Sequence, residues 1–236
     1  MTRYVVRPKG ILTTPRLLAE KLDARTRSAG QVCWQSDFFL YYPEPSVVRN
    51  ADEAYHKVFN FARKTKKGQR DAIRETGVLV PDCYESDRCV VRPLRHRSGS
   101  DFRIVPAGTA HNTTTEYVSP FFSKQWEYRL IFSKGTHLLT LFKRVDPGTP
   151  SDVPWNHACG STFVTTNNWN ACRLRHTSVL GDLQGCPIIN TAHLVAVDVM
   201  LRKQPLGAWE YAVCEYNFCP SLSIERNLEK VVDHVR

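Results

Sequence analysis

The sequence predicts an α+β protein made of two lobes and a short N-terminal lead-in region. Two amphipathic helical segments precede residue 77, short strand-like segments follow from about residue 88, and a helical segment closes the chain. A length of 236 residues suits one large domain or two small lobes sharing a cleft. We expect the lead-in region over 1–59, a small lobe over 60–120 and a large lobe over 121–236.

The first half of the chain contains the helical patterns. Leu17, Leu18 and Leu22 form an apolar stripe, and we expect that helix to continue until Gly30. Residues 31–42 are aromatic-rich and strand-like. A second amphipathic helix carries apolar residues at i, i+3, i+4 and i+7, namely Tyr55, Val58, Phe59 and Ala62. A short helix over 69–76, ended by Gly77, completes this half.

Strand patterns dominate from residue 88 to residue 216. Residues 89–91 and 102–105 form one expected hairpin, and residues 127–133 and 137–145 form another around Lys134, Gly135 and Thr136. Residues 146–171 are rich in Pro, Gly, Asn, Ser and Thr, which predicts a long functional or mobile loop. Strands over 194–201 and 209–216 and a helix over 222–235 follow.

Composition excludes some classes of protein. The 42% hydrophobic and 23% charged content is that of a globular chain. No apolar run approaches the roughly 20 residues of a membrane helix, and the N-terminus lacks the apolar core of a secretory signal, so we expect a cytoplasmic protein without a membrane partner. The eight cysteines show no C-x-x-C spacing and are expected to be reduced structural thiols. The net charge of +9 favours a polyanionic partner such as a nucleotide or nucleic acid.

The last two expected strands carry the residues that indicate chemistry. Asp198 interrupts an apolar strand, and Glu215 and Asn217, two residues apart, project from one face of the next strand. Carboxylate and amide oxygens are ligands that Mg²⁺ prefers and shares with substrate phosphates. An exposed polar strand edge would produce the same residues, but an apolar strand rarely retains an unpaired carboxylate.

Six motifs in order resemble the ATP-grasp superfamily, from about residue 60 to the C-terminus. Residues 215–222, EYNFCPSL, resemble the family's E-x-N-x-x-P-G-L, with Ser221 in place of glycine, and residues 197–199 resemble its V-D-V strand. The other matching segments are GVLVP at 77–81, VVRPLRHRSGSDFRIV at 90–105, TEYVSPF at 115–121, and EYRLIF with LFKRV and N-x-x-x-G over 127–160. The last group resembles the carboxylate–amine ligase branch, which includes ribosomal-protein glutamate ligases, and the compact chain resembles small ATP-grasp ligases of bacteriophage genomes.

The resemblance implies a role for each matching residue. For the nucleotide, it implies that Arg92 holds the α- and β-phosphates, that Glu116, Tyr117 and Val118 contact adenine, that Glu127 contacts the ribose and that Lys66 reaches the nucleotide. It implies that Asp198, Glu215 and Asn217 bind one or two Mg²⁺ ions. For catalysis, it implies that Arg129, Lys143 and Arg144 face the γ-phosphate or the acyl phosphate and that Asn156 helps to hold that intermediate.

The implied reaction is ATP- and Mg²⁺-dependent ligation of a carboxylate to an amine. The γ-phosphoryl group activates the carboxylate as an acyl phosphate, which an amine then attacks; such chemistry needs positioning and charge neutralisation more than a protein nucleophile. The expected partners are ATP and an amino acid or another acidic carboxylate, with a polyanion as a possible substrate.

Two other functions fit the same sequence. A degenerate ATP-grasp domain would bind nucleotide without catalysis, and Arg92 and Ser221, which depart from the family pattern, keep this alternative open. A basic nucleic-acid-binding protein would use the runs at 63–70 and 92–97, and its binding would depend strongly on salt. Simple readings also exist for single residues: Arg129 could pair with Glu127 or Glu116, and Lys143 could be solvated.

Overall fold

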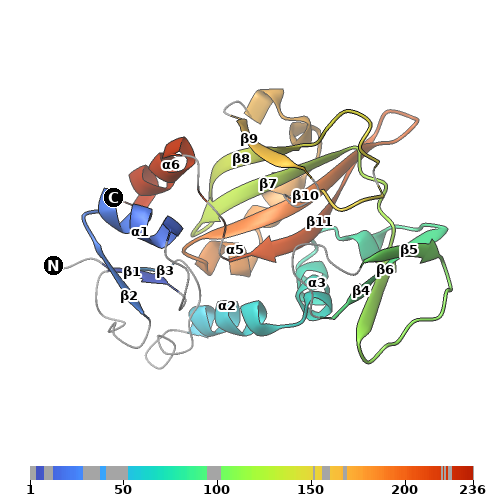
Figure 1. The fold of residues 1–236 in the computed structure, drawn as a ribbon, viewed down its shortest axis with the longest axis horizontal. Helices are drawn as coiled ribbons and strands as arrows, with labels where there is room; N and C mark the ends of the chain where they lie inside the picture. The colour runs from blue at the N-terminus through green and yellow to red at the C-terminus, as the bar shows by residue number, and fades with distance from the viewer. Residues whose placement is uncertain are drawn as a thin grey trace.

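The computed structural model describes most of the chain. The described residues are 4–7, 13–28, 38–40, 53–94, 102–150, 152–155, 160–166, 169–218, 220, 222 and 225–235. They form three sheets and several helices, which confirms the α+β class (Figure 1). No described helix is long and apolar enough to cross a membrane.

The N-terminal part is a small parallel sheet with one helix. The strands β1 (Tyr4–Arg7), β2 (Arg25–Ser28) and β3 (Phe38–Leu40) lie in the order β2-β1-β3, and α1 (Thr13–Lys21) connects the first two. The expectation that this helix continues to Gly30 is wrong. It ends at Lys21, because Asp23, with a φ of 49°, turns the chain into β2.

The smaller of the two remaining sheets belongs to the predicted small lobe. It consists of β4 (Arg88–Pro93), β5 (Arg103–Pro106) and β6 (Glu116–Pro120), in the order β5-β4-β6. The antiparallel pairing of β4 with β5 confirms the first predicted hairpin. Two helices precede this sheet along the chain, α2 (Glu53–Arg63) and α3 (Lys66–Glu75), followed by the 3-10 turn η3 (Pro81–Cys83).

The large sheet has the order β11-β10-β7-β8-β9 and is antiparallel. Its strands are β7 (Trp126–Ser133), β8 (Thr136–Arg144), β9 (Thr162–Thr166), β10 (Val195–Lys203) and β11 (Trp209–Asn217). Gly135 forms the β7–β8 turn with a φ of +81°, a conformation that favours glycine. A Cβ at this position would also lie 2.6 Å from the side-chain oxygen of Asn190, so the close contact favours glycine as well. Both predicted hairpins of this lobe are confirmed.

One predicted loop is wrong in part. Residues 162–166, inside the expected loop over 146–171, form the edge strand β9, which pairs with β8. Its sequence, Thr-Phe-Val-Thr-Thr, consists of β-branched and aromatic residues that favour strands. Residues 169–191, left without an expected structure, contain the 3-10 turns η5 (Trp169–Ala171) and η6 (Arg173–His176) and the short helices α4 (Val179–Gln184) and α5 (Pro187–Thr191).

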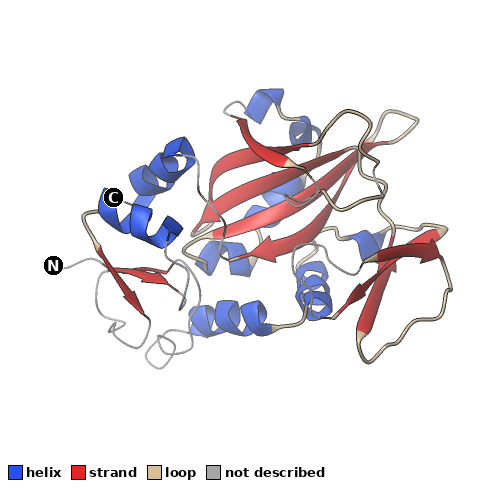
Figure 2. Cartoon of the chain, in the orientation of Figure 1, coloured by secondary structure: helices blue, strands red, loops and turns tan. Residues whose placement is uncertain are grey.

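The two faces of the large sheet have different surroundings. One face presents residues such as Val197 and Val199 to a core that includes Phe61 and Ile73 from α2 and α3 and Ile189 from α5 (Figure 2). Alternating residues of the same strands face the other way. There, one end of the sheet is covered by α1 and by α6 (Glu225–Val235), through the apolar cluster Leu18, Leu139, Leu141, Ala196 and Leu228.

The packing joins segments that lie far apart in the sequence. The last helix, α6, contacts α1, while α2 contacts α5, so both ends of the chain lie at one end of the molecule (Figure 1). Contacts therefore cross the predicted boundaries at residues 59 and 120, and the division into 1–59, 60–120 and 121–236 stays a prediction.

Candidate active site

The pairing of three central strands places polar side chains next to each other on the large sheet. In β10, Asp198 lies opposite Arg129 of β7 on one side and opposite Glu215 of β11 on the other. Residues opposite each other in a sheet project from the same face. A β-bulge beside Asp198 breaks the regular pairing at this point of the two strands. The face that α1 and α6 leave uncovered thus carries a charged cluster, defined as Lys66, Lys124, Glu127, Arg129, Lys143, Asp198 and Glu215.

Asp198 and Arg129 form the most enclosed pair of the cluster. The Arg129 Nε donates to Oδ1 of Asp198 at 2.6 Å and its Nη2 donates to Oδ2 at 2.7 Å, a two-pronged arrangement typical of strong ion pairs. Asp198 is only 4% exposed. Burial alone would raise the pKa of Asp198, but the charges of Arg129, Lys143 and Lys66 outweigh burial and hold this pKa below its ordinary value. The carboxylate is therefore ionised at neutral pH.

Lys66 is the first residue of α3, and it reaches across to β11. Its Nζ lies 3.0 Å from Oε2 of Glu215. The Thr65 side chain accepts a hydrogen bond from the Gly68 N–H and thereby fixes the start of the helix. Lys66, predicted to reach the nucleotide, thus lies against a predicted metal ligand.

Glu127 lies between two buried lysines. The Lys124 Nζ donates to one carboxylate oxygen at 2.7 Å, and the Lys143 Nζ donates to the other. Burial lowers the pKa of Lys143, but Glu127 and Asp198 raise it more, so the ammonium stays charged. The ring of Phe163 on β9 lies under two of these cations, 4.4 Å from the Arg129 Cζ and 5.3 Å from the Lys143 Nζ.

The oxygen ligands of the cluster suit Mg²⁺ in kind. No described group of three or more His, Cys, Asp or Glu side chains could hold a metal ion by itself. Asp198 and Glu215 lie directly opposite each other, and Asn217 adds an amide two residues further along β11. Mg²⁺ is commonly held by one or two carboxylates together with substrate phosphates, not by a complete protein cage. Two carboxylates and an amide at the edge of a pocket fit that pattern.

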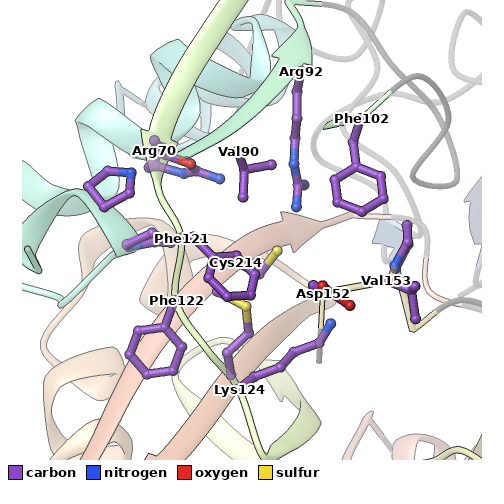
Figure 3. A pocket seen from close by; sticks show the side chains of 15 residues that line it. Arg70, Val90, Arg92, Phe102, Phe121, Phe122, Lys124, Asp152, Val153 and Cys214 are labelled. Carbon is purple, nitrogen blue, oxygen red and sulfur yellow. The ribbon is translucent and has the colours of Figure 1, made fainter. Parts of the chain in front are cut away.

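A pocket adjoins the cluster, between the small sheet and the large one (Figure 3). Its volume is about 440 Å³ including the open mouth. Val90 and Arg92 of β4 form one wall, and Met200 of β10 and Cys214 of β11 form the opposite one. The remaining lining residues are Arg70, Pro81, Phe102, Ser119, Pro120, Phe121, Phe122, Lys124, Asp152, Val153 and Pro154. The lining combines apolar surface with four charged side chains, Arg70, Arg92, Lys124 and Asp152, which suits a small molecule that is itself partly charged.

The strand β6 borders this pocket and carries the residues predicted to contact adenine. It is an edge strand, paired with β4 but with no other described strand on its far side. The Glu116 side chain is occupied by Arg103, whose two nitrogens lie 2.5 and 3.1 Å from its oxygens, and by the Asn112 N–H. These bonds lower the pKa of Glu116 to about 2. Glu116 and Val118 direct backbone groups to the free edge of β6, although the Glu116 N–H is already bonded to the Asn112 C=O, while Tyr117, in phase with Thr115 and Phe121, directs its backbone groups toward β4.

Two predicted catalytic residues are not brought into the cluster. Arg144 is exposed and projects from β8 on the face opposite to Lys143, as expected for adjacent strand residues. Asn156 lies outside the described residues. The simple reading of Lys143 as a solvated lysine is wrong, since the side chain is 6% exposed. Arg129 is indeed ion-paired, but with Asp198 and not with Glu127 or Glu116.

Sequence reasoning missed three residues of this region: Lys124, Phe163 and Arg70. Lys124 follows the TEYVSPF motif closely and could have been found as a charge between two apolar segments. Phe163 lies in the segment that the sequence predicts as a loop, so the sequence gives no reason to place its ring beside Arg129. Arg70 belongs to the basic run at 63–70, where six other polar residues make one buried cation hard to recognise from the sequence.

Comparisons with known proteins were made on sequence and on structure. No protein-family model and no curated protein matches the sequence. Solved structures do match. The ATP-grasp ligase PsnB, complexed with a minimal precursor, matches with a TM-score of 0.58 at 11% identity, covering 99% of this chain and 97% of PsnB. The D-cycloserine synthetase DcsG matches with a TM-score of 0.52 at 13% identity over 100% of both chains.

A third match is N5-carboxyaminoimidazole synthetase from Staphylococcus aureus, complexed with ADP. Its TM-score is 0.59 at 9% identity, and the match covers 99% of this chain and 76% of the synthetase. At these identities the likeness concerns the fold. In all three cases the match spans at least 99% of this chain. The chain has the ATP-grasp fold.

Proposed function

We propose that this protein is an ATP- and Mg²⁺-dependent ligase that joins a carboxylate to an amine through an acyl phosphate. One observation carries the proposal. Two opposed carboxylates, Asp198 and Glu215, lie beside Arg129, Lys66 and Lys143 at the edge of a pocket between two lobes. Such a site can bind a triphosphate through metal and cations while the pocket holds the base.

The nucleotide would be held by residues from both lobes. Arg92 on β4 would contact the α- and β-phosphates, the free backbone edge of the segment 116–118 would contact adenine, and Lys66 would move from Glu215 to a phosphate oxygen. Asp198, Glu215 and Asn217 would hold Mg²⁺. When bound, Mg²⁺ neutralises phosphate charge and orients the γ-phosphoryl group.

Arg129 and Lys143 would stabilise the charge that develops during phosphoryl transfer. In that step a substrate carboxylate oxygen bonds to the γ-phosphorus while the bond to the β,γ-bridging oxygen breaks, releasing ADP. The amine then attacks the acyl carbon, a C–N bond forms, and phosphate and a proton leave. Phe163 and Glu127 would keep both cations in place, since each contacts one or both of them. Asn156 would help to hold the acyl phosphate, and Arg144, on the opposite face, has no part in this step.

The structural neighbours support the reaction class. Their names describe an ATP-grasp ligase with a precursor and two synthetases, one of them with ADP. The substrate would be an amino acid or another acidic carboxylate, and the net charge of +9 supports an acidic or polyanionic one. We place the reaction in the cytoplasm, where ATP is available.

The test is nucleotide turnover. ADP and phosphate release would be measured with Mg²⁺ and ATP across pools of amino acids and acidic acceptors, for the wild type and for Glu215→Ala. We expect release that depends on one pool and is lost in Glu215→Ala, because a metal ligand is missing. Glu229→Ala, which removes an exposed carboxylate on α6, is the matched control and should retain turnover.

The result also separates the alternatives. Pool-independent binding of Mg²⁺–ATP without turnover would point to a binding domain that lacks catalysis. Salt-dependent nucleic-acid binding that survives Glu215→Ala, without nucleotide binding, would contradict the ligase proposal.

A further inference from the structure

Arg70 is a buried cation in the pocket that the proposed mechanism does not use. It lies on α3, one helical turn after Lys66, and is only 5% exposed. Among the described residues, its Nε and Nη1 have no hydrogen-bond partner. Arg70 forms an ion pair with Asp82, whose Oδ2 lies 3.6 Å from Nη1, but this distance is too long for a hydrogen bond, and that oxygen also has no hydrogen-bond partner among the described residues. Figure 3 shows the side chain among the residues that line the pocket.

A buried guanidinium with unused donors favours a ligand that accepts hydrogen bonds. Arginine has five N–H donors and no acceptor, and leaving a buried donor unpaired costs more than a typical hydrogen bond contributes. The Tyr117 ring, 5.3 Å from the Arg70 Cζ, stabilises the charge but offers the guanidinium no in-plane acceptor. The two unused nitrogens belong to a residue that lines the pocket, so an acceptor in the pocket is the partner that would complete the site.

The position of Arg70 indicates which part of a nucleotide it would meet. Lys66 marks the metal end of the site, because it pairs with Glu215. Arg70 is one helical turn, about 5.4 Å along the axis, from Lys66. Lys66 does not line the pocket and Arg70 does. Arg70 also stacks on the ring of Tyr117, in the strand β6 that is predicted to contact adenine, so with phosphates held near Glu215 it lies on the side of the base.

The surroundings of Arg70 in the pocket suit a planar ring. Val90, Phe102, Phe122 and Met200 supply apolar surface. The free edge of β6 has both N–H and C=O groups, which match the mixed donor and acceptor edge of adenine. Arginine can only donate, so it matches a purine nitrogen that only accepts. With N1 and N6 facing the edge of β6, the acceptor next to N6 that stays available is N7.

We propose that Arg70 is a specificity-determining residue that donates a hydrogen bond to N7 of the purine base of the bound nucleotide. The inference rests on the proposed function, in that it takes the pocket to be the nucleotide site. It assigns to α3 a second contact with the nucleotide, in addition to the one made by Lys66.

The experiment compares ATP with 7-deaza-ATP, in which a C–H group replaces N7. Dissociation constants with Mg²⁺ would be measured by titration calorimetry for the wild type, Arg70→Met and the control Arg74→Met. Arg74 lies on the same helix, but its side chain is 51% exposed and outside the pocket, so its loss removes the same charge without touching the base. Asp82→Asn tests whether Arg70 acts only through its carboxylate neighbour.

We expect the wild type and Arg74→Met to bind ATP about tenfold more tightly than 7-deaza-ATP, a ratio typical of one hydrogen bond to a charged group. In Arg70→Met the two nucleotides should bind equally, and Asp82→Asn should keep the wild-type ratio. Equal affinity of the wild type for both nucleotides would by itself overturn the proposal. An unchanged ratio in Arg70→Met would also overturn it, because the base would then be recognised elsewhere. Failure of the wild type to bind either nucleotide would instead contradict the proposed function.

Discussion

At the scale of single residues, the charge on Asp198 depends on Arg129. The carboxylate is almost fully enclosed in the middle of an apolar strand, and both of its oxygens accept hydrogen bonds from one guanidinium. A buried ion pair contributes little net stability compared with apolar residues, but removing one partner leaves an uncompensated charge. Replacing either residue alone should therefore destabilise the protein more than replacing both.

This dependence predicts the effect of Arg129→Met on stability. We expect the free energy of unfolding to fall by about 3–5 kcal/mol, because Asp198 stays buried without its partner. The double variant Arg129→Met/Asp198→Leu should recover most of the loss. Urea denaturation in Mg²⁺-free buffer measures the difference. Arg144→Met, an exposed arginine on the opposite face of the sheet, should change the free energy by less than about 0.5 kcal/mol. If Arg129→Met lowered the free energy of unfolding by less than about 1 kcal/mol, as a surface substitution does, Asp198 would not be buried with Arg129 as its partner.

The sequence was sufficient to predict the carboxylates but not their partners. Asp198 and Glu215 could be expected to meet, because each lies on one of two successive strands and the pattern E-x-N fixes a common face. The partners Lys66 and Lys124 come from a helix and a linker, whose positions depend on how the lobes pack. Arg144 shows the opposite case, since strand alternation already placed it on the face away from Lys143.

At the scale of elements, predictions succeeded where a turn residue and a strong hydrophobic pattern agreed. The β7–β8 hairpin has Gly135 at its turn and the β10–β11 hairpin has Gly207, with a φ of +93°. The strand β9 was missed because its five strand-favouring residues lie inside a longer segment rich in Pro, Gly, Asn and Ser, which outweighs them in the sequence, and because it is short and at an edge of the sheet. The early end of α1 was missed because the turn at Asp23 needs no glycine or proline.

The helix α6 illustrates how an element far along the sequence completes the N-terminal part. Leu228 is 1% exposed and packs in one cluster with Leu18 of α1 and Leu139 of the large sheet. We expect Leu228→Ala to lower the free energy of unfolding by about 2–5 kcal/mol, because it leaves a cavity between three elements. Asp233→Ala, on the exposed side of the same helix, is the control for helix propensity. Denaturant unfolding followed by circular dichroism provides the measurement, and equal effects of the two substitutions would contradict this packing.

At the scale of the whole molecule, one sheet serves both stability and chemistry. In the described part, one of its faces packs mainly against an apolar core, with Arg144 exposed on that same face, while the other is divided between a half covered by α1 and α6 and a half that carries the charged cluster. The small sheet faces that charged half across the pocket (Figure 3). The fold thereby places buried charge where a nucleotide can reach it, and packs most of the remaining sheet in two apolar clusters.

The most direct test of this account is a calorimetric titration of the protein with ATP, with and without Mg²⁺. We expect the affinity for ATP to fall at least about tenfold when Mg²⁺ is removed by a chelator. Asp198→Asn or Glu215→Gln should lower the affinity by a similar factor with Mg²⁺ present, because both carboxylates hold the metal that the phosphates share. Binding of ATP that is indifferent to Mg²⁺ and to both substitutions, or no binding at all, would contradict the central claim that this cluster is a metal–nucleotide site.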